Sequence, residues 1–152
     1  MESFETNKHC FIFDLDGTLA NIEHRLHFIK REKPDWTMFN ECCLNDRPID
    51  EVIRMCRFLS DAHYIMVCTG RMGTESVKQK TVRWLNENRV PYTELMFRAD
   101  RDYRPDHEVK KEMLDHIRKT YYVAGAFDDR DQVVDMWRAN GVMTYQVARG
   151  AY

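Results

Sequence analysis

The chain alternates short apolar runs with segments whose apolar residues recur at helical spacing. The helical segments, 50–61, 74–88, 106–119 and 131–140, repeat apolar residues every three or four positions. The runs between them have the length of strands: CFIF (10–13), YIMVC (64–68), ELMF (94–97), YYVAGAF (121–127) and VMTYQVA (142–148). This alternation predicts an α/β fold, with a mainly parallel sheet and helices on both faces.

Capping residues indicate where some of these helices begin and end. Ser76 with Gln79 matches a capping box at the start of the helix over 74–88. Asp106 is well placed as the N-cap of the helix over 106–119, and Gly141 is expected to end the helix over 131–140.

A long polar insert, residues 19–47, follows the first predicted strand. Its ring-bearing residues, His24, His27, Trp36 and Phe39, could contact a sugar or a nucleobase, because aromatic rings stack on bases. Residues of this kind more often pack a small cap against the core of a protein. We therefore expect the insert to be a small cap-like element.

Composition indicates one soluble domain over residues 1–152. Of the 152 residues, 43% are hydrophobic and 32% are charged, and no apolar run approaches the roughly 20 residues that span a bilayer. The first ten residues lack a signal-peptide pattern, so we expect a cytoplasmic location and no membrane contact. Five cysteines without a Cys-x-x-Cys pair favour reduced thiols and give no zinc-ligand spacing. The net charge of −2 provides no global attraction to nucleic acid, and no pattern specifies an oligomeric state.

Polar residues follow four of the predicted strands. In a parallel sheet, ligands bind beyond the carboxyl ends of the strands, so these residues are expected to meet at one edge. They are Asp14 after the first strand, Thr69 and Arg71 after the second, Arg98 and Asp100 after the third, and Asp128 and Asp129 after the fourth. We interpret them as a cation site beside an anion site.

The segment DLDGT (14–18) places two carboxylates at the end of an apolar strand, where like charges repel and burial is costly. Mg²⁺, held by hard oxygen ligands on a few loops, would neutralise them and admit a phosphate. An aspartate such as Asp14 can then attack phosphorus, while Asp16 serves as general acid and then base. Gly17 allows close approach of the backbone, and Thr18 can orient the second acid.

DLDGT resembles the first motif of the haloacid dehalogenase superfamily, most of whose members are Mg²⁺-dependent phosphohydrolases. The resemblance implies a Rossmann-like, three-layer fold, with Asp14 as nucleophile and Asp16 as acid and base. Thr69, in CTGR, is similar to the phosphate-binding second motif, and Lys110 to the third motif, which neutralises the phosphoaspartate.

The segment FDDR (127–130) is similar to the acidic fourth motif of the superfamily. The resemblance implies Asp129, together with Asp128, as metal ligands in addition to Asp14 and Asp16. By this alignment Asp129 is the stronger candidate of the two.

The segment 128–152 is similar to the end of the phosphatase domain of bacteriophage polynucleotide kinase–phosphatases, which remove 3′-phosphates from nucleic acid ends. This resemblance covers essentially the whole chain. It implies substrate-binding roles for Arg25, Gly70, Arg71, Asp106 and Arg130. The sequence has no Gly-x-x-x-x-Gly-Lys-Ser/Thr loop for ATP, so kinase activity is not expected.

Three functions are compatible with these patterns. The first is a Mg²⁺-dependent phosphatase acting on 3′-phosphates of nucleic acid ends or nucleotides. The second is a phosphatase of broad specificity for small monoesters, including 5′-nucleotides. The third is a phosphate-accepting receiver module, which the Asp-Gly-Thr context and Arg98 after the third strand both disfavour.

Overall fold

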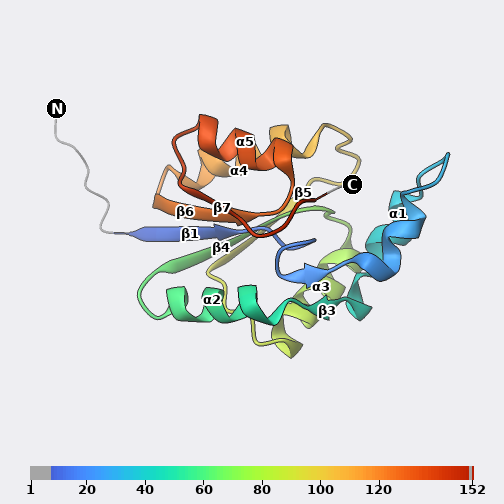
Figure 1. Ribbon diagram of the computed structural model, residues 1–152, viewed down its shortest axis with the longest axis horizontal. Coiled ribbons are helices and arrows are strands. Elements are labelled where there is room, and N and C mark those ends of the chain that lie inside the picture. The colour runs from blue at the N-terminus through green and yellow to red at the C-terminus, as the bar shows by residue number, and fades with distance from the viewer. Residues whose placement is uncertain (1–7, 151) are drawn as a thin grey trace.

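A five-stranded sheet lies at the centre of the computed structural model, which describes residues 8–150 and 152. All four pairs of neighbouring strands are parallel, and the strand order is β5-β4-β1-β6-β7 (Figure 1). The predicted parallel α/β sheet is therefore confirmed. Its strands are β1 (His9–Phe13), β4 (Tyr64–Met72), β5 (Glu94–Arg98), β6 (Tyr122–Asp128) and β7 (Thr144–Gln146).

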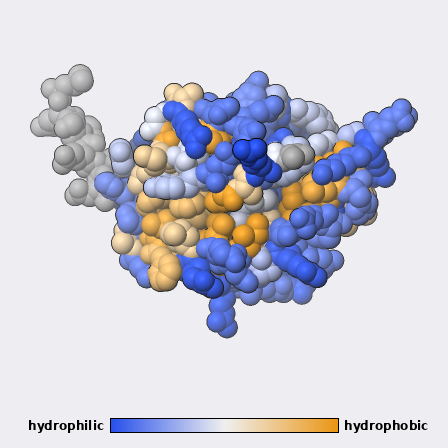
Figure 2. Space-filling view, in the orientation of Figure 1, coloured by the Kyte–Doolittle hydropathy of each residue, from blue (hydrophilic) through white to orange (hydrophobic). Residues whose placement is uncertain are grey.

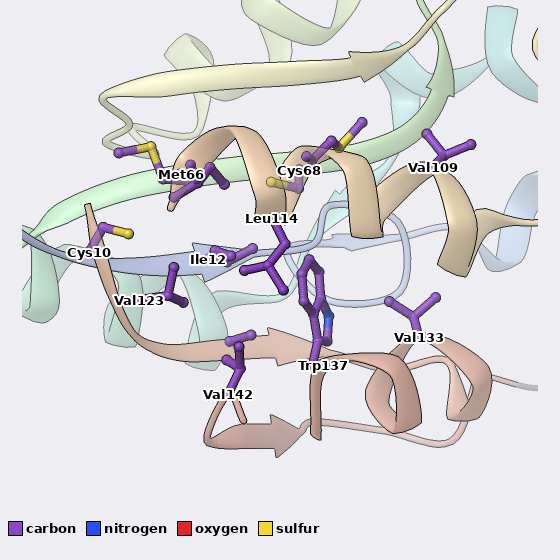
Figure 3. Close-up of a cluster of buried hydrophobic side chains, with 13 residues drawn as sticks. Cys10, Ile12, Met66, Cys68, Val109, Leu114, Val123, Val133, Trp137 and Val142 are labelled. Carbon is purple, nitrogen blue, oxygen red and sulfur yellow. The ribbon is translucent and has the colours of Figure 1, made fainter. Parts of the chain in front are cut away.

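Two helices cover each face of the sheet, which gives three layers (Figure 1). On one face α4 and α5 enclose a core in which Trp137 and Leu114 lie together against Ile12 of β1 (Figure 3). On the other face Trp84 and Ile53 pack with Phe13 in a second core. The helices are α4 (Asp106–Ile117) and α5 (Asp131–Ala139) on the first face, and α2 (Asp50–Ser60) and α3 (Glu75–Glu87) on the second. Each large buried apolar side chain contributes roughly 1.5–3 kcal/mol to folding.

Some hydrophobic side chains remain exposed outside these cores. Met55 and Phe58 of α2 and Tyr145 of β7 are 45%, 66% and 48% exposed. Figure 2 shows a hydrophobic area on the side of the molecule between α2 and β7.

The strand β4 is four residues longer than the apolar run that predicted it. It continues through Thr69, Gly70 and Arg71 to Met72, with a register shift against β5. Backbone pairing with β5, rather than apolar side chains, extends the strand. The Thr-Gly-Arg triplet therefore lies in the last part of β4 and not after it.

Two predicted helix caps are wrong, whereas a third helix end is as expected. Thr74 precedes α3 and its hydroxyl accepts a hydrogen bond from a helical amide at 3.3 Å, so Ser76 is not the cap. Pro105 is the N-cap of α4, and Asp106 is the first helical residue without a side-chain cap bond. The carboxylate of Asp106 is therefore available to other groups. Gly141, with φ 75°, follows the C-cap of α5.

Residues 20–48 form a small subdomain beyond the carboxyl end of β1 (Figure 1). Lys80 of α3 donates a hydrogen bond to the carbonyl of Glu41 at 2.9 Å, and Trp84 donates to the carbonyl of Asp46 at 2.8 Å. Both bonds attach the subdomain to α3. Its elements are β2 (Ala20–Asn21), the 3₁₀ helix η1 (Glu23–Phe28), α1 (Trp36–Glu41), the 3₁₀ helix η2 (Cys43–Asn45) and β3 (Arg47–Pro48), and β2 pairs antiparallel with β3.

All five cysteines are unpaired, as the sequence predicts. Among the described residues, no helix is both long enough and apolar enough to cross a membrane.

Candidate active site

The carboxyl end of the sheet borders one cavity of about 260 Å³, where several predicted site residues meet. Asp14, Asp16, Gly70, Arg71, Asp106 and Arg130 line it. The other predicted residues lie behind this wall and are at most 2% exposed: Arg25, Thr69, Lys110, Asp128 and Asp129. Arg98 also lines the cavity, whereas Asp100 does not, because the chain turns away after β5 and leaves Asp100 exposed. The predicted convergence of strand ends is therefore present in the structure except at Asp100.

Asp14 accepts hydrogen bonds on both of its carboxylate oxygens. Lys110 Nζ donates to Oδ1 at 2.7 Å, and the Thr18 hydroxyl donates to Oδ2 at 2.9 Å. Gly17, with φ 82°, turns the chain so that Thr18 reaches back to Asp14. A Cβ atom at Gly17 would lie 2.1 Å from Asp129 Oδ2, so the turn requires glycine for space as well.

Asp128 and Asp129 use their carboxylates differently. Oδ1 of Asp128 accepts from the next two backbone amides at 2.9 and 3.3 Å, and Oδ2 accepts from Lys110 at 3.0 Å and Trp137 Nε1 at 3.2 Å. In the described part of the chain, only two hydroxyl groups lie within hydrogen-bond distance of the Asp129 carboxylate, Tyr152 at 3.0 Å and Thr18 at 3.4 Å, and each has a closer acceptor elsewhere. Asp128 therefore serves to fix Lys110, whereas Asp129 keeps free lone pairs.

The cluster of Asp14, Asp128 and Asp129 fits a divalent cation. Each offers a carboxylate oxygen, all within 4.8 Å of one another, and the ammonium of Lys110 faces them. Burial, reinforced by the charge of Asp128, raises the pKa of Asp14 well above its ordinary value and that of Asp129 to about 6. Three buried acids opposite one ammonium leave excess negative charge, and hard carboxylate oxygens suit Mg²⁺. Asp14 and Asp129 would hold the ion.

The side chain of Asp16 is not part of this cluster and binds two arginines. Arg25 Nη2 donates to Oδ1 at 2.7 Å, and Arg71 Nη2 donates to the same oxygen at 2.6 Å. Asp46 accepts from both arginines as well, at 2.7 and 3.0 Å. Burial opposes ionisation of Asp16, but the two guanidinium groups outweigh it and hold its pKa well below the ordinary value.

Arg25 and Arg71 are 0% and 1% exposed, and protein atoms surround their guanidinium groups. Arg25 Nη1 donates to a carbonyl of α1, and Arg71 Nη1 donates to a threonine hydroxyl of α3, both at 3.0 Å. The backbone amide of Arg71 donates to the Thr69 hydroxyl at 3.1 Å. The two arginines thus orient Asp16. Of their two positive charges, Asp16 balances one and Asp46 balances the other. Sequence reasoning missed Asp46, because it follows no predicted strand and no motif marks it.

Helix α4 brings Asp106 and Lys110 to the site from one face, with Nζ 3.5 Å from Asp106 Oδ2. Arg98 Nη2 donates to Asp106 Oδ1 at 3.3 Å, and Arg130 Nη1 lies 3.7 Å from Oδ2. Burial opposes the charge of Lys110, but its three neighbouring acids raise its pKa well above the ordinary value. A Cβ atom at Gly70 would lie 2.3 Å from Asp106 Oδ1, so the observed position of the Asp106 carboxylate requires glycine at position 70.

The comparison with known families agrees with this geometry. The sequence profile of the polynucleotide kinase PNKP phosphatase domain matches residues 8–152. The chain belongs to this family. It is a phosphatase domain of the PNKP type, and the receiver alternative is excluded.

Solved structures extend the comparison for this PNKP-type domain. A chain from the Pnkp1/Rnl/Hen1 complex is 28% identical, with a TM-score of 0.81, and the match covers 95% of this chain and 47% of that one. A chain from the Pnkp1/Rnl/Hen1 RNA repair complex is 27% identical, with a TM-score of 0.80, and the match covers 100% and 46% of the two chains. The PNKP-type domain therefore spans about half the length of these two relatives.

More distant structures show the fold alone. A haloacid dehalogenase-like hydrolase from Streptococcus pneumoniae is 13% identical, with a TM-score of 0.61 and coverage of 91% and 84%. A haloacid dehalogenase-superfamily hydrolase from Geobacter sulfurreducens is also 13% identical, with a TM-score of 0.59 and coverage of 100% and 96%. The haloacid dehalogenase fold predicted from DLDGT is confirmed.

The ring-bearing residues of the insert take different positions in the PNKP-type domain. Phe39 is 4% exposed and packs under the guanidinium of Arg25, 4.2 Å from the ring centre. The ring of His24 bonds to Asp46 at 2.7 Å, and His27 packs on its neighbour Phe28. Trp36 and Phe39 both line the cavity, but Trp36 differs because it is 48% exposed.

Tyr152 is a further cavity residue that sequence reasoning missed. Its hydroxyl lies 2.7 Å from the carbonyl oxygen of Asp16 and 3.0 Å from Asp129 Oδ2, and its single proton can be donated to either; Arg130 lies over its ring at 5.2 Å. No local pattern marks a tyrosine so far along the chain from the motifs it contacts.

Proposed function

We propose that this phosphatase domain uses Mg²⁺ to hydrolyse 3′-phosphates of nucleic acid ends or nucleotides through an aspartyl-phosphate on Asp14. The observation that carries the proposal is the buried Asp14 carboxylate, bound by Lys110 and Thr18 at the wall of the cavity. The relatives from an RNA repair complex support a nucleic acid substrate. The 3′ position rests on the resemblance of residues 128–152 to phosphatase domains that remove 3′-phosphates from nucleic acid ends.

The reaction has two steps. An oxygen of Asp14 attacks phosphorus while the bond from phosphorus to the ester oxygen breaks, and that oxygen takes a proton from Asp16. Water then attacks the same phosphorus and gives a proton to Asp16, and the Asp14–phosphorus bond breaks to release inorganic phosphate. Lys110 and Thr18 keep the Asp14 oxygens in place throughout. Mg²⁺, when bound, offsets the negative charge of the phosphate.

Asp16 must change its protonation state during this cycle. Arg25 and Arg71 favour its ionised form, which is the base of the second step. An incoming phosphate dianion repels that negative charge and raises the pKa of Asp16, which favours the acid of the first step. We therefore propose that the two arginines orient Asp16 and set its pKa. Arg71 also forms part of the cavity wall.

Arg130 is the arginine that we assign to the phosphate itself. It lines the cavity, 28% of its side chain is exposed, and its nearest acid, Asp106, is 3.7 Å away. A guanidinium can bind two phosphate oxygens at once. Asp106 and Gly70 shape the wall beside it, and buried Thr69 supports the backbone of Arg71.

We propose further that residues 1–152 act as one domain, with the insert 19–47 as a cap-like wall of the cavity. No ATP-binding Gly-x-x-x-x-Gly-Lys-Ser/Thr loop occurs in the sequence, so we assign no kinase activity to this chain.

The test measures phosphate release from four substrates: a 3′-phosphorylated oligonucleotide, its 5′-phosphorylated isomer, a 3′-nucleotide and a 5′-nucleotide. We expect preference for the 3′ position, dependence on Mg²⁺ and inhibition by EDTA. Asp14→Asn should lose at least about 10³-fold in turnover, because it removes the nucleophile. Asp135→Asn, the same change at an exposed aspartate of α5, is the matched control.

Preference for the 5′-nucleotide, or equal rates on all four substrates, would instead support the alternative, a phosphatase for 5′-nucleotides and small monoesters. Turnover by Asp14→Asn at the wild-type rate would remove Asp14 as the nucleophile.

A further inference from the structure

Two exposed aromatic side chains border the cavity that contains Asp14. Trp36, in α1, is 48% exposed, and Tyr103, between β5 and α4, is 81% exposed. Both segments lie at the end of the molecule where β1 terminates (Figure 1). A single exposed aromatic needs no explanation, but two that share one catalytic cavity form a distinct feature.

Contacts within the insert hold Trp36 in position. Asp35 accepts a hydrogen bond from the Met38 amide at 2.9 Å and caps α1, and Asn40 Nδ2 donates to the Trp36 carbonyl at 2.7 Å. The Trp36 ring meets Phe39 edge to face, with ring centres 5.6 Å apart. Phe39 in turn packs on a buried arginine. The indole is therefore placed before any ligand binds.

The backbone around Tyr103 is fixed in a comparable way. Arg98 Nη1 donates to the carbonyl of Asp102 at 3.1 Å, and the amide and Nε of Arg104 donate to the Asp102 carboxylate at 3.1 and 3.0 Å. Arg101 has a left-handed φ of 62°, a strained conformation for a residue with a side chain. These bonds hold the loop while its phenol ring extends into solvent.

The size of the cavity limits which part of a substrate it encloses. A volume of about 260 Å³ lies below the roughly 300–1,000 Å³ of pockets that enclose whole drug-sized ligands. A phosphate at Asp14 with its sugar would fill much of this space. The attached base would then lie at the mouth, where the two aromatic rings are exposed.

We propose that Trp36 and Tyr103 stack on the base of the terminal nucleotide that carries the phosphate. This inference rests on the proposed 3′-phosphatase function. Flat aromatic faces bind every base through its π-face, so the recognition tolerates any sequence.

The experiment compares two 3′-phosphorylated oligonucleotides that differ only in the presence of the terminal base. The measured quantity is the ratio of kcat/KM with the base to kcat/KM without it. Wild-type protein should give a ratio of about 5- to 150-fold, the contribution of stacking on one base. Trp36→Ala and Tyr103→Ala should each lower this ratio towards one, and Trp36→Phe should restore part of it. Tyr122→Ala, at an exposed tyrosine that does not line the cavity, should keep the wild-type ratio.

The outcomes separate this inference from the proposed function. A wild-type ratio near one, with brisk turnover of both oligonucleotides, would overturn base stacking and leave the 3′-phosphatase function intact. Ratios in both alanine variants equal to that of the wild type would also overturn it. If the wild type hydrolyses a small phosphate monoester but neither oligonucleotide, the proposed function fails, and the inference fails with it.

Discussion

The substitution Asp46→Asn tests whether the buried arginine network holds the site together. Asp46 is 5% exposed and accepts from Arg25 at 2.7 Å through Nε and Nη2, and from Arg71 at 3.0 Å. Asparagine keeps the shape but removes the charge, which leaves two buried guanidinium groups opposite Asp16 alone. Breaking a buried ion pair in this way costs about 3–5 kcal/mol.

This cost can be measured as a fall in Tm. At about 2–4 °C per kcal/mol for a domain of this size, Asp46→Asn should lower Tm by roughly 6–20 °C. Thermal unfolding followed by circular dichroism measures the shift. Asp115→Asn is the matched control. It also removes the charge of a paired aspartate, but in this pair, Asp115 with Lys111, both side chains are exposed. Such a pair contributes about 0.3–0.5 kcal/mol, which corresponds to roughly 1–2 °C.

The same variant should also lose phosphatase activity, because Arg25 and Arg71 no longer hold Asp16 in one position. Equal Tm values for Asp46→Asn and Asp115→Asn would refute the reasoning. They would show that the network contributes little to folding despite its burial.

Two further predictions concern the glycine and the metal ligand of the site. Gly70→Ala should destabilise the fold by about 1–3 kcal/mol and slow turnover, because its Cβ would lie 2.3 Å from Asp106 Oδ1. Urea unfolding measures this change, and an unchanged free energy of unfolding would contradict the prediction. Mg²⁺ should raise Tm more at about pH 7.5 than at about pH 5, since a proton competes with the ion for Asp129. The pKa of Asp129 is raised to about 6 in the folded metal-free protein, so its protonation favours folding at low pH, and this contribution is lost as pH rises through about 6. Differential scanning fluorimetry with and without Mg²⁺ measures both gains, and equal gains at the two pH values would count against Asp129 as a ligand.

The central strands β1, β4 and β6 were predictable because they are apolar runs that are mostly buried, and the edge strands β5 and β7, which are less buried, because they continue the alternation of strands and helices. The extension of β4 through Thr69 to Met72 was not, because hydrogen bonds to β5 produce it and side-chain polarity does not report them. The cap of α3 depended on which of Thr74 and Ser76 the preceding turn places at the helix start, and the sequence pattern alone favoured the wrong one.

The residues of the site also differ in how far the sequence alone predicts them. Asp14 lies after the first strand, where the strand-end rule predicts it, whereas Lys110 lies in α4 and was identified only by its resemblance to the third motif. Asp46 comes from a loop of the insert, and only the tertiary fold brings it to the arginines. Trp36 and Phe39 are both aromatic and three positions apart, yet one is exposed at the cavity and the other is buried. Sequence cannot distinguish them without the position of Arg25, whose guanidinium covers the ring of Phe39.

The way in which the insert is attached has a consequence for how substrates enter. Arg25 and Asp46, which both belong to the insert, share a charge network with Arg71 of the central sheet. Opening the insert as a hinged lid would separate these buried charges in every catalytic cycle, at a cost comparable to that of Asp46→Asn. We therefore expect the entrance to keep one width. A substrate end would have to fit this aperture as it stands, and release of phosphate would need no movement of the insert.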